Sequence, residues 1–274
     1  METINPLKYS RDMNGKFLFI RHGQTICNSD KNTKERKINY EYIDSHLSLK
    51  GIEQTKELQK LIEKLNIESI YVSPLYRSLE TAKYIINDNY KGDIIVHPLI
   101  VECQNCIDDF IFDIKQTKND FKNLNVIWNI FDEYVKENKK WDENFFYFAY
   151  FNCLEENEKI KKYNKLFNLL NKGDMNSLKK EIVNEIPKII FNTESFKPFE
   201  SFKHVYSRFL TFKKFLLEKH QYTLNDLTQK VLIITHGDYL GVITNKYLYN
   251  NDTINFFPKD CCHCKNCDII SLYL

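Results

Sequence analysis

Two histidines each stand directly after a run of residues typical of a buried strand. Lys16–Ile20 leads into an Arg-His-Gly turn that holds His22, and Val231–Thr235 leads into a His-Gly turn that holds His236. In an open sheet of parallel strands, the carboxyl ends of the strands lie along one edge, where ligands bind. A neutral imidazole can act there as a nucleophile. The sequence therefore predicts that His22 and His236 meet at one edge of a sheet.

Two arginines occupy comparable positions, and a guanidinium group is suited to binding the oxygen atoms of an anion. Arg21 follows the first strand, and Arg77 lies in the first turn of a helix that follows the strand Ser69–Val72. We expect Ser73 to cap this helix and Pro74 to occupy its first position. Arg77 could instead be a solvated surface residue, but a second strand-to-turn junction in a parallel sheet points to the same edge as the first.

One acidic residue completes the set. Glu102 follows the third predicted strand, Ile94–Val101, which Pro98 interrupts. Two arginines, two histidines and a carboxyl group are the equipment for phosphoryl transfer, in which positioning and neutralisation of charge supply most of the catalysis. The residue types and their places therefore predict a phosphoryl-transfer site.

Helices alternate with these strands along the chain. Apolar residues at helical spacing follow Ser48, which we expect to cap a helix, and further helices are expected from Phe199 and over Leu240–Tyr249. Asp268–Leu274 is the predicted closing strand. The pattern predicts an α/β fold, a three-layer α/β/α sandwich with a mostly parallel central sheet, and one catalytic domain over residues 1–274.

A long interval, residues 107–198, separates the acid from the second histidine. Its pattern predicts helices near Phe121–Lys139, Glu155–Leu170 and Met175–Ile186. We interpret the interval as a helical insertion within the domain that folds over the active-site edge as a cap and shapes substrate choice. The alternative is an extra helical layer that only buries surface.

At this point the sequence resembles branch 1 of the histidine phosphatase superfamily, the phosphoglycerate mutase-like fold. The matching segments agree with the family in order and spacing from about residue 16 to the end, excluding the insertion. They are Arg21–Thr25 with Asn28, Leu47–Ser48 with Gly51 and Gln54, Ser73–Arg77 with Thr81–Ala82, Glu200–Ser201 with Arg208, and Thr235–Gly237.

The resemblance implies a role for each matched site residue. His22 would attack phosphorus and carry a phosphohistidine, and nearby cations would help to keep it neutral. The side chains that would hold the phosphoryl oxygens are Arg21, Asn28, Arg77 and His236. Of these, His236 would also be catalytic. Gln24 stands where many relatives have Glu, and both residues occur in the family.

Glu102 matches the family's proton donor, which protonates the leaving alkoxide and then activates water. In the family a Gly-rich segment usually follows this residue, whereas here Cys103–Asp109 follows. Asp108 or Asp109 could therefore be the donor instead, and Glu102 could merely end a strand.

The resemblance leaves three functions to weigh. Mutases of the family carry a loop with Trp and Gly after the first histidine, and Ser29–Ser45 contains neither. We therefore favour hydrolysis of phosphomonoesters over mutase activity. The third function is that of a pseudoenzyme acting as a binding module. The expected partner is a phosphorylated small molecule, and a phosphoprotein stays open as an alternative.

Two Cys-x-x-Cys pairs stand far apart in the sequence, Cys103 with Cys106 and Cys264 with Cys267. Such pairs can hold a structural zinc ion. We prefer the alternative of reduced thiols, which are the norm inside cells. The family chemistry implies a metal-independent phosphatase with no cofactor.

The composition is that of a globular protein, with 43% hydrophobic and 28% charged residues among 274. A net charge of +2 gives no general attraction to nucleic acid or to a membrane surface. The first 15 residues are polar and contain no visible signal peptide, and the aromatic run at 145–151 is too short to span a bilayer. We expect a cytoplasmic protein with neither nucleic-acid nor membrane partners.

The remaining histidines have no motif around them. We expect His204 and His220 at the surface or boundary of predicted helices, whereas His46 is a candidate substrate contact from the loop before Leu47. No role is predicted for His97 or His263.

Overall fold

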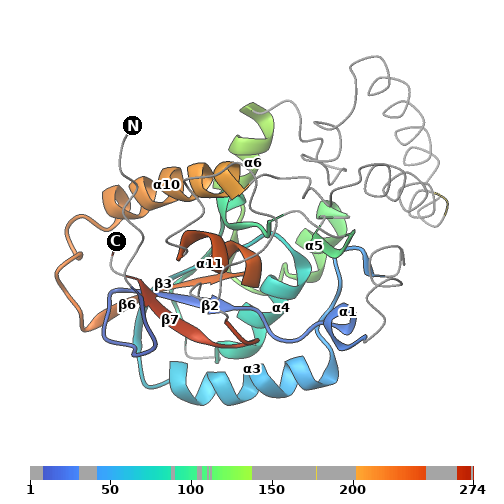
Figure 1. The fold of residues 1–274 in the computed structure, drawn as a ribbon, viewed down its shortest axis with the longest axis horizontal. Helices are drawn as coiled ribbons and strands as arrows, with labels where there is room; N and C mark the ends of the chain where they lie inside the picture. Colours follow the sequence, from blue (N-terminus) through green and yellow to red (C-terminus); the bar gives the residue numbers. More distant parts are fainter. Residues whose placement is uncertain are drawn as a thin grey trace.

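The computed structural model describes residues 9–30, 42–87, 90–103, 107–109, 111, 113–137, 177, 202–244, 264–272 and 274. In these residues a central sheet lies between helices on its two faces (Figure 1). The predicted three-layer α/β architecture is confirmed.

The sheet has seven strands in the order β1, β7, β2, β6, β3, β4 and β5. The strands are β1 (Tyr9–Ser10), β2 (Phe17–Arg21), β3 (Asn66–Val72), β4 (Asp93–Val96), β5 (Val126–Ile127), β6 (Gln229–Thr235) and β7 (Ile269–Leu272). The pairs β2–β6, β6–β3, β3–β4 and β4–β5 are parallel, whereas β1–β7 and β7–β2 are antiparallel. Because β2 and β6 are parallel neighbours, with Arg21 opposite Thr235, the residues that follow them share one edge.

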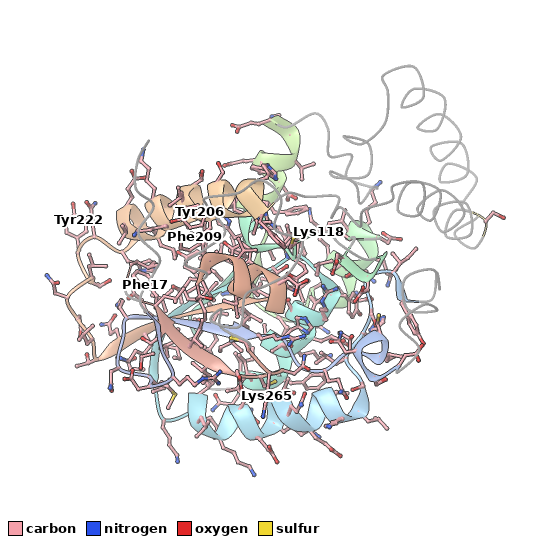
Figure 2. The ribbon with its side chains drawn as sticks, viewed as in Figure 1. Phe17, Lys118, Tyr206, Phe209, Tyr222 and Lys265 are labelled. Atoms are coloured by element: carbon pink, nitrogen blue, oxygen red, sulfur yellow. The ribbon has the colours of Figure 1, made fainter. Side chains whose placement is uncertain are left out.

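Side chains alternate along each strand, so the two faces of the sheet carry separate hydrophobic cores. Leu18 and Ile20 point to the face that α3 and α4 cover, and Phe17 and Phe19 point to the face of α10 and α11. These helices are α3 (Leu49–Ile62), α4 (Tyr76–Ile85), α10 (Phe202–Lys219) and α11 (Gly237–Ile243). Phe209 of α10 is fully buried in the second core (Figure 2).

The turn after β2 docks directly against the start of α3. Ser48 caps α3 as predicted, with its hydroxyl accepting from the Gly51 N–H. A Cβ on Gly51 would lie 2.0 Å from the Gln24 carbonyl oxygen, and a Cβ on Gly23 would lie 2.8 Å from the Gly51 carbonyl oxygen. The two backbones can approach this closely only because both residues are glycine, and this contact fixes the loop that carries His22.

The described part of the predicted insertion is not purely helical. Its helical elements are η3 (Ile107–Asp109), α5 (Ile114–Asp120) and α6 (Asn129–Glu137). Two short elements elsewhere in the chain are α1 (Ile26–Ser29) and η2 (Pro98–Ile100). The helix predicted near Phe121–Lys139 is confirmed for Asn129–Glu137 and wrong before it, since the β-branched Val126–Ile127 pair with β4 as β5 between α5 and α6. The interval thus begins by extending the central sheet.

Two other element boundaries also differ from the predictions. The helix after β3 begins at Tyr76 with Leu75 as its N-cap, and not at Pro74 with Ser73 as cap, because Ser73 is engaged by another side chain described below. The strand predicted to reach Val101 ends at Val96, since Pro98 opens the 3₁₀ turn η2.

Several predictions fall on residues outside the described part of the chain. These are the helices over Glu155–Leu170 and Met175–Ile186, the residues before Phe202 in the helix expected from Phe199, and positions 245–249. The single domain over 1–274 and the cap over 107–198 stay predictions. Among the helices that the structure describes, none has the length and apolar character needed to cross a membrane.

Candidate active site

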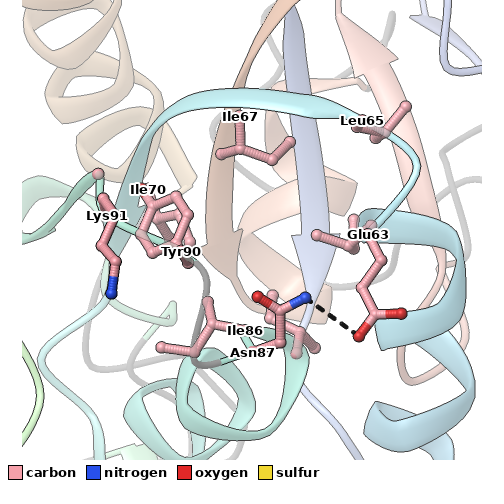
Figure 3. Close-up of a pocket in the computed structure, with 11 residues that line it drawn as sticks. Glu63, Leu65, Ile67, Ile70, Ile86, Asn87, Tyr90 and Lys91 are labelled. Atoms are coloured by element: carbon pink, nitrogen blue, oxygen red, sulfur yellow. Dashed lines mark hydrogen bonds between the residues drawn. The ribbon is translucent and has the colours of Figure 1, made fainter.

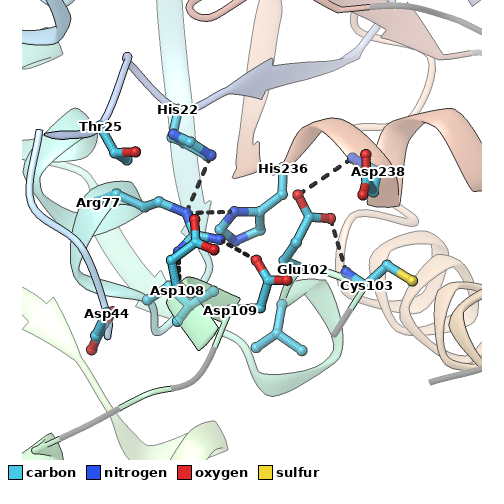
Figure 4. Close-up of polar contacts among 12 residues, drawn as sticks. His22, Thr25, Asp44, Arg77, Glu102, Cys103, Asp108, Asp109, His236 and Asp238 are labelled. Carbon is cyan, nitrogen blue, oxygen red and sulfur yellow. Dashed lines mark hydrogen bonds and ion pairs between the residues drawn. The ribbon is translucent and has the colours of Figure 1, made fainter. Parts of the chain in front are cut away.

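The two strand-end histidines meet at the carboxyl edge of the sheet, beside Arg77 of α4 (Figure 4). The ring centroids of His22 and His236 are 5.0 Å apart. The backbone ladder continues past the strands, with the His22 N–H donating to the Thr235 carbonyl oxygen at 3.0 Å. The parallel pairing of β2 and β6 therefore sets the spacing of the two imidazoles.

The hydrogen bonds of His22 define which nitrogen can react. Its Nδ1 lies 2.7 Å from the Gly23 carbonyl oxygen, and because a carbonyl only accepts, Nδ1 carries the proton. The lone pair on Nε2 faces the Arg77 Nε–H at 3.2 Å. Burial, together with Arg77 and Arg21, holds the pKa of His22 well below its usual value. His22 is therefore neutral at physiological pH, with a nucleophilic nitrogen directed into the site.

His236 has the opposite tautomer. Its Nδ1 accepts from the same Arg77 Nε–H at 3.3 Å, so its proton lies on Nε2, which donates to the Ser73 hydroxyl at 2.7 Å. Burial and Arg77 hold the pKa of His236 well below its usual value. Local sequence gave no signal for this role of Ser73, because its partner lies 163 positions away.

Arg77 contacts more residues of the site than any other side chain described above, and it is only 2% exposed. Besides the two imidazoles, its guanidinium donates to the backbone carbonyl of Asp108 and to the Asp109 carboxylate, the latter at 3.1 Å. Arg77 is therefore a buried residue of the site and not a solvated surface residue. An incoming anion must exchange with some of these partners.

Arg21 approaches the site from β2. Its Nη1 donates to the Cys264 carbonyl oxygen at 2.7 Å, and its buried Nε has no hydrogen-bond partner among the described residues. A Cβ on Gly237 would lie 2.9 Å from the Arg21 Cζ. Glycine at the start of α11 thus leaves room for the guanidinium beside the two histidines.

Glu102 is held by backbone N–H groups at the N-terminus of α11. Its Oε1 accepts from Tyr239 and from Cys103, each at 2.8 Å, whereas Oε2 accepts only a longer bond of 3.3 Å from Asp238. Burial raises the pKa of Glu102 to about 7, with Asp238 adding to the effect and Arg77 opposing it. Glu102 can therefore hold a proton near neutral pH, and Oε2 is the oxygen with free capacity to carry it.

The two alternative acids have other positions in the site. Asp108 contacts Arg77 through its backbone carbonyl, and the Asp109 carboxylate forms an ion pair with Arg77. A carboxylate paired with a guanidinium favours its ionised form. Of the three acids, Glu102 has the environment that best suits a proton donor.

The turn that carries His22 is locked by residues to which the sequence analysis gave no role. Thr81 of α4 accepts from the Gly23 N–H at 3.0 Å and donates to the Arg77 carbonyl oxygen. Asn266 donates to the His22 carbonyl oxygen at 3.0 Å. Thr81 was part of the family resemblance, whereas nothing in the sequence around Asn266 indicated this contact.

Asn28 is engaged in local structure. It forms a capping box at the start of α1, in which its N–H donates to the Thr25 hydroxyl at 2.9 Å and its side chain accepts from the Thr25 N–H. Its predicted role in holding phosphate stays a prediction.

The cysteine pairs are not gathered into a metal site in the described residues. Cys103 and Cys264 are buried in the core under α10, and Cys267 packs against the core on the other face of the sheet. Within the described ranges, no group of three or more His, Cys, Asp or Glu side chains is arranged to hold a metal ion. Cys106 and His263 lie outside those ranges.

Two other histidines make contacts outside the candidate site. The rings of His46 and Tyr76 are tilted against each other with centroids 4.1 Å apart, and His46 Nδ1 lies 3.3 Å from the Glu80 carboxylate. The expectation that His220 lies at the surface or boundary is wrong, since its side chain is buried and contacts Glu68 and the Tyr71 hydroxyl.

A separate cavity of about 420 Å³ opens near the start of β3 (Figure 3). Its lining is largely apolar and includes Ile67, Ile70 and Ile86, with the Asn87–Glu63 hydrogen bond at its rim. It lies toward the amino end of β3, whereas the histidines stand at the carboxyl edge of the sheet, so it is not part of the candidate active site.

Known proteins share the segment that builds most of this site. Residues 17–107 match the model of the histidine phosphatase superfamily (branch 1). The chain is 29% identical to "Probable fructose-2,6-bisphosphatase TIGAR A" of Danio rerio over 86 residues. These residues are 30% of this chain and 32% of that protein. It is 31% identical to the 2,3-bisphosphoglycerate-dependent phosphoglycerate mutase of Methanosarcina mazei over 83 residues, which cover 30% of this chain and 32% of the mutase.

Each of these alignments thus spans about a third of the relative's length. Among solved structures, the ecdysone phosphate phosphatase of Bombix mori is similar at 12% identity and a TM-score of 0.43, with 92% of this chain and 86% of that chain covered. The matched segment contains His22, Arg77 and Glu102. Through this segment, about a third of its length, the chain is similar to the histidine phosphatase superfamily (branch 1).

Proposed function

We propose that the chain is a phosphatase that hydrolyses phosphomonoesters through a phosphohistidine on His22, with Glu102 as the proton donor. The observation that carries the proposal is the shared Arg77 Nε–H, which faces the lone pairs of His22 Nε2 and His236 Nδ1 at 3.2 and 3.3 Å. Two neutral imidazoles and a guanidinium thus converge on one point, where a phosphoryl group would meet a nucleophile and its charge partners.

In the first step, the Arg77 Nε–H exchanges His22 Nε2 for a phosphoryl oxygen. The freed lone pair of Nε2 attacks phosphorus, and the bond from phosphorus to the ester oxygen breaks. The leaving oxygen takes the proton from Glu102, so the alcohol departs neutral. Arg21 and Arg77 neutralise the charge on the phosphoryl oxygens. A substrate bound as the monoanion gives its proton to His236 Nδ1, and the resulting imidazolium donates a hydrogen bond back to one of these oxygens.

In the second step, the Glu102 carboxylate takes a proton from water as the water oxygen attacks phosphorus. The bond from phosphorus to Nε2 breaks, and inorganic phosphate leaves with His22 neutral again. A single acid thus serves in both directions, which requires a pKa near the working pH. The raised pKa of Glu102, about 7, supports this assignment.

Substrate binding requires an exchange at Arg77. The phosphoryl oxygens take the place of the Asp109 carboxylate, which forms the ion pair with the guanidinium in the structure. We propose a phosphorylated small molecule as substrate, with a phosphoprotein as the alternative, and a cytoplasmic location. The interval 107–198 is proposed to shape substrate choice as a cap.

The test is hydrolysis of p-nitrophenyl phosphate without added metal between pH 5 and 8. We expect activity in the wild type and a loss of at least about 1,000-fold in His22→Ala. His204→Ala, an exposed histidine of α10, is the matched control and should keep full activity. Wild-type activity that survives in His22→Ala would refute the nucleophile, and an inactive wild type that still binds phosphate would favour a binding module. Net transfer of phosphate between positions of a phosphoglycerate would indicate a mutase.

A further inference from the structure

Arg208 of α10 reaches into the segment that carries the acid. It is 8% exposed, and its Nη1 donates to the carbonyl oxygens of Leu99 and Val101 at 2.7 and 2.9 Å. Its Nη2 donates to the carbonyl oxygen of Glu102 at 3.0 Å. One guanidinium therefore holds three carbonyl groups in the stretch between β4 and the acid.

The same guanidinium also contacts the residue that holds the Glu102 carboxylate. Its Cζ lies 5.1 Å from the ring centroid of Tyr239, within the range of a cation–π interaction. The Tyr239 N–H donates to Glu102 Oε1 at 2.8 Å. Arg208 thus links the backbone of Glu102 to the first turn of α11, where its carboxylate is bound.

The segment around Glu102 is not held by the strand ladder of the sheet. The strand β4 ends at Val96, and the segment then runs through η2, outside the sheet ladder. Thr235 donates to the Ile100 carbonyl oxygen at 2.8 Å, but the carbonyls of Val101 and Glu102 face Arg208. A buried carbonyl left without a donor would pull the segment toward water.

We propose that Arg208 is a positioning residue for proton transfer, which holds Glu102 Oε2 where it can reach the leaving oxygen. The proposal rests on the proposed phosphatase function. Arg208 bonds to the segment of Glu102 and lies over Tyr239, and its charge also helps to lower the pKa of His236. Because Arg208→Lys keeps this charge and loses the planar guanidinium, it should affect proton donation and leave nucleophilic attack nearly intact.

Two substrates separate these steps. p-Nitrophenolate leaves well without a proton, whereas the alkoxide of glycerol phosphate needs one. In Arg208→Lys and Arg208→Ala, we expect kcat for glycerol phosphate to fall by roughly 10- to 100-fold and kcat for p-nitrophenyl phosphate by less than about 3-fold. The ratio of the two rates does not depend on the fraction of folded enzyme, so partial unfolding cannot imitate this result.

Two further variants sharpen the test. Lys214→Ala removes an exposed cation of the same helix and should leave the ratio unchanged. In a Glu102→Gln background, Arg208→Lys should add less than about 2-fold to the loss on glycerol phosphate, because two residues that act through one proton are not additive.

Equal losses on both substrates in an active enzyme, or full additivity with Glu102→Gln, would overturn the positioning role alone. A wild type that hydrolyses neither substrate would overturn the proposed function and, with it, the positioning role.

Discussion

The proton held by Glu102 makes a specific prediction for stability. Replacing this residue with Gln mimics the protonated acid, since the Gln carbonyl oxygen can accept from Cys103 and Tyr239 as Oε1 does. The folded protein raises the pKa of Glu102 from 4.5 to about 7, chiefly through burial. The folded state therefore binds a proton more tightly than the unfolded state, and this contribution to stability is lost as the pH rises from about 4.5 to about 7.

The size of the effect follows from the change in pKa, which corresponds to about 3 kcal/mol once both states are ionised. We expect the free energies of unfolding of wild type and Glu102→Gln to be similar at pH 5. At pH 8 the variant should be more stable by up to about 3 kcal/mol, although much slower toward glycerol phosphate. Urea denaturation at half-unit pH intervals measures this difference, in which titrating groups that do not interact with Glu102 cancel.

A difference between the two proteins that stays constant from pH 5 to pH 8 would refute the reasoning. A variant that loses stability as the pH rises would do so as well, because that sign requires a lowered pKa for Glu102. Either result would leave Glu102 without the environment expected of a proton donor.

Three further substitutions test the site and its frame. Gly237→Ala should lower kcat/KM for p-nitrophenyl phosphate by roughly 10- to 100-fold in a folded protein, because the new Cβ would lie 2.9 Å from the Arg21 Cζ; unchanged kinetics would contradict this packing. Asp109→Asn should tighten inhibition by inorganic phosphate by roughly 3- to 10-fold, because the competing charge on Arg77 is removed; weaker inhibition would show that Asp109 assists binding. Gly51→Ala should lower the free energy of unfolding in urea by about 3 kcal/mol, because the new Cβ would lie 2.0 Å from a backbone oxygen. Alanine is the better helix former, so a gain in stability would contradict the close approach of the two backbones.

The strand-end residues of the site could be predicted because their signals are local. Apolar runs before His22 and His236 mark buried strands, and parallel strands end at one edge. The structure brings the two imidazoles together with Arg77, as expected. Glu102 also lies at this edge, although the strand before it ends six residues earlier, at Val96.

The supporting contacts could not be predicted because each joins residues far apart in the chain. Ser73 has the sequence of a helix cap, yet its hydroxyl accepts a hydrogen bond from a histidine 163 residues away. The bonds from Arg208 to the segment before Glu102 span more than 100 residues. Val126–Ile127 form a strand only because the edge of β4 is available to pair with them.

The central claim is the covalent intermediate on His22, and one measurement tests it most directly. Wild-type enzyme is mixed with substrate labelled in its phosphoryl group, quenched in alkali within milliseconds and digested into peptides. We predict label that is stable to alkali, labile to acid and confined to the peptide containing His22, with none in His22→Ala. Label on another residue, or steady turnover with no labelled enzyme at any time, would contradict the account.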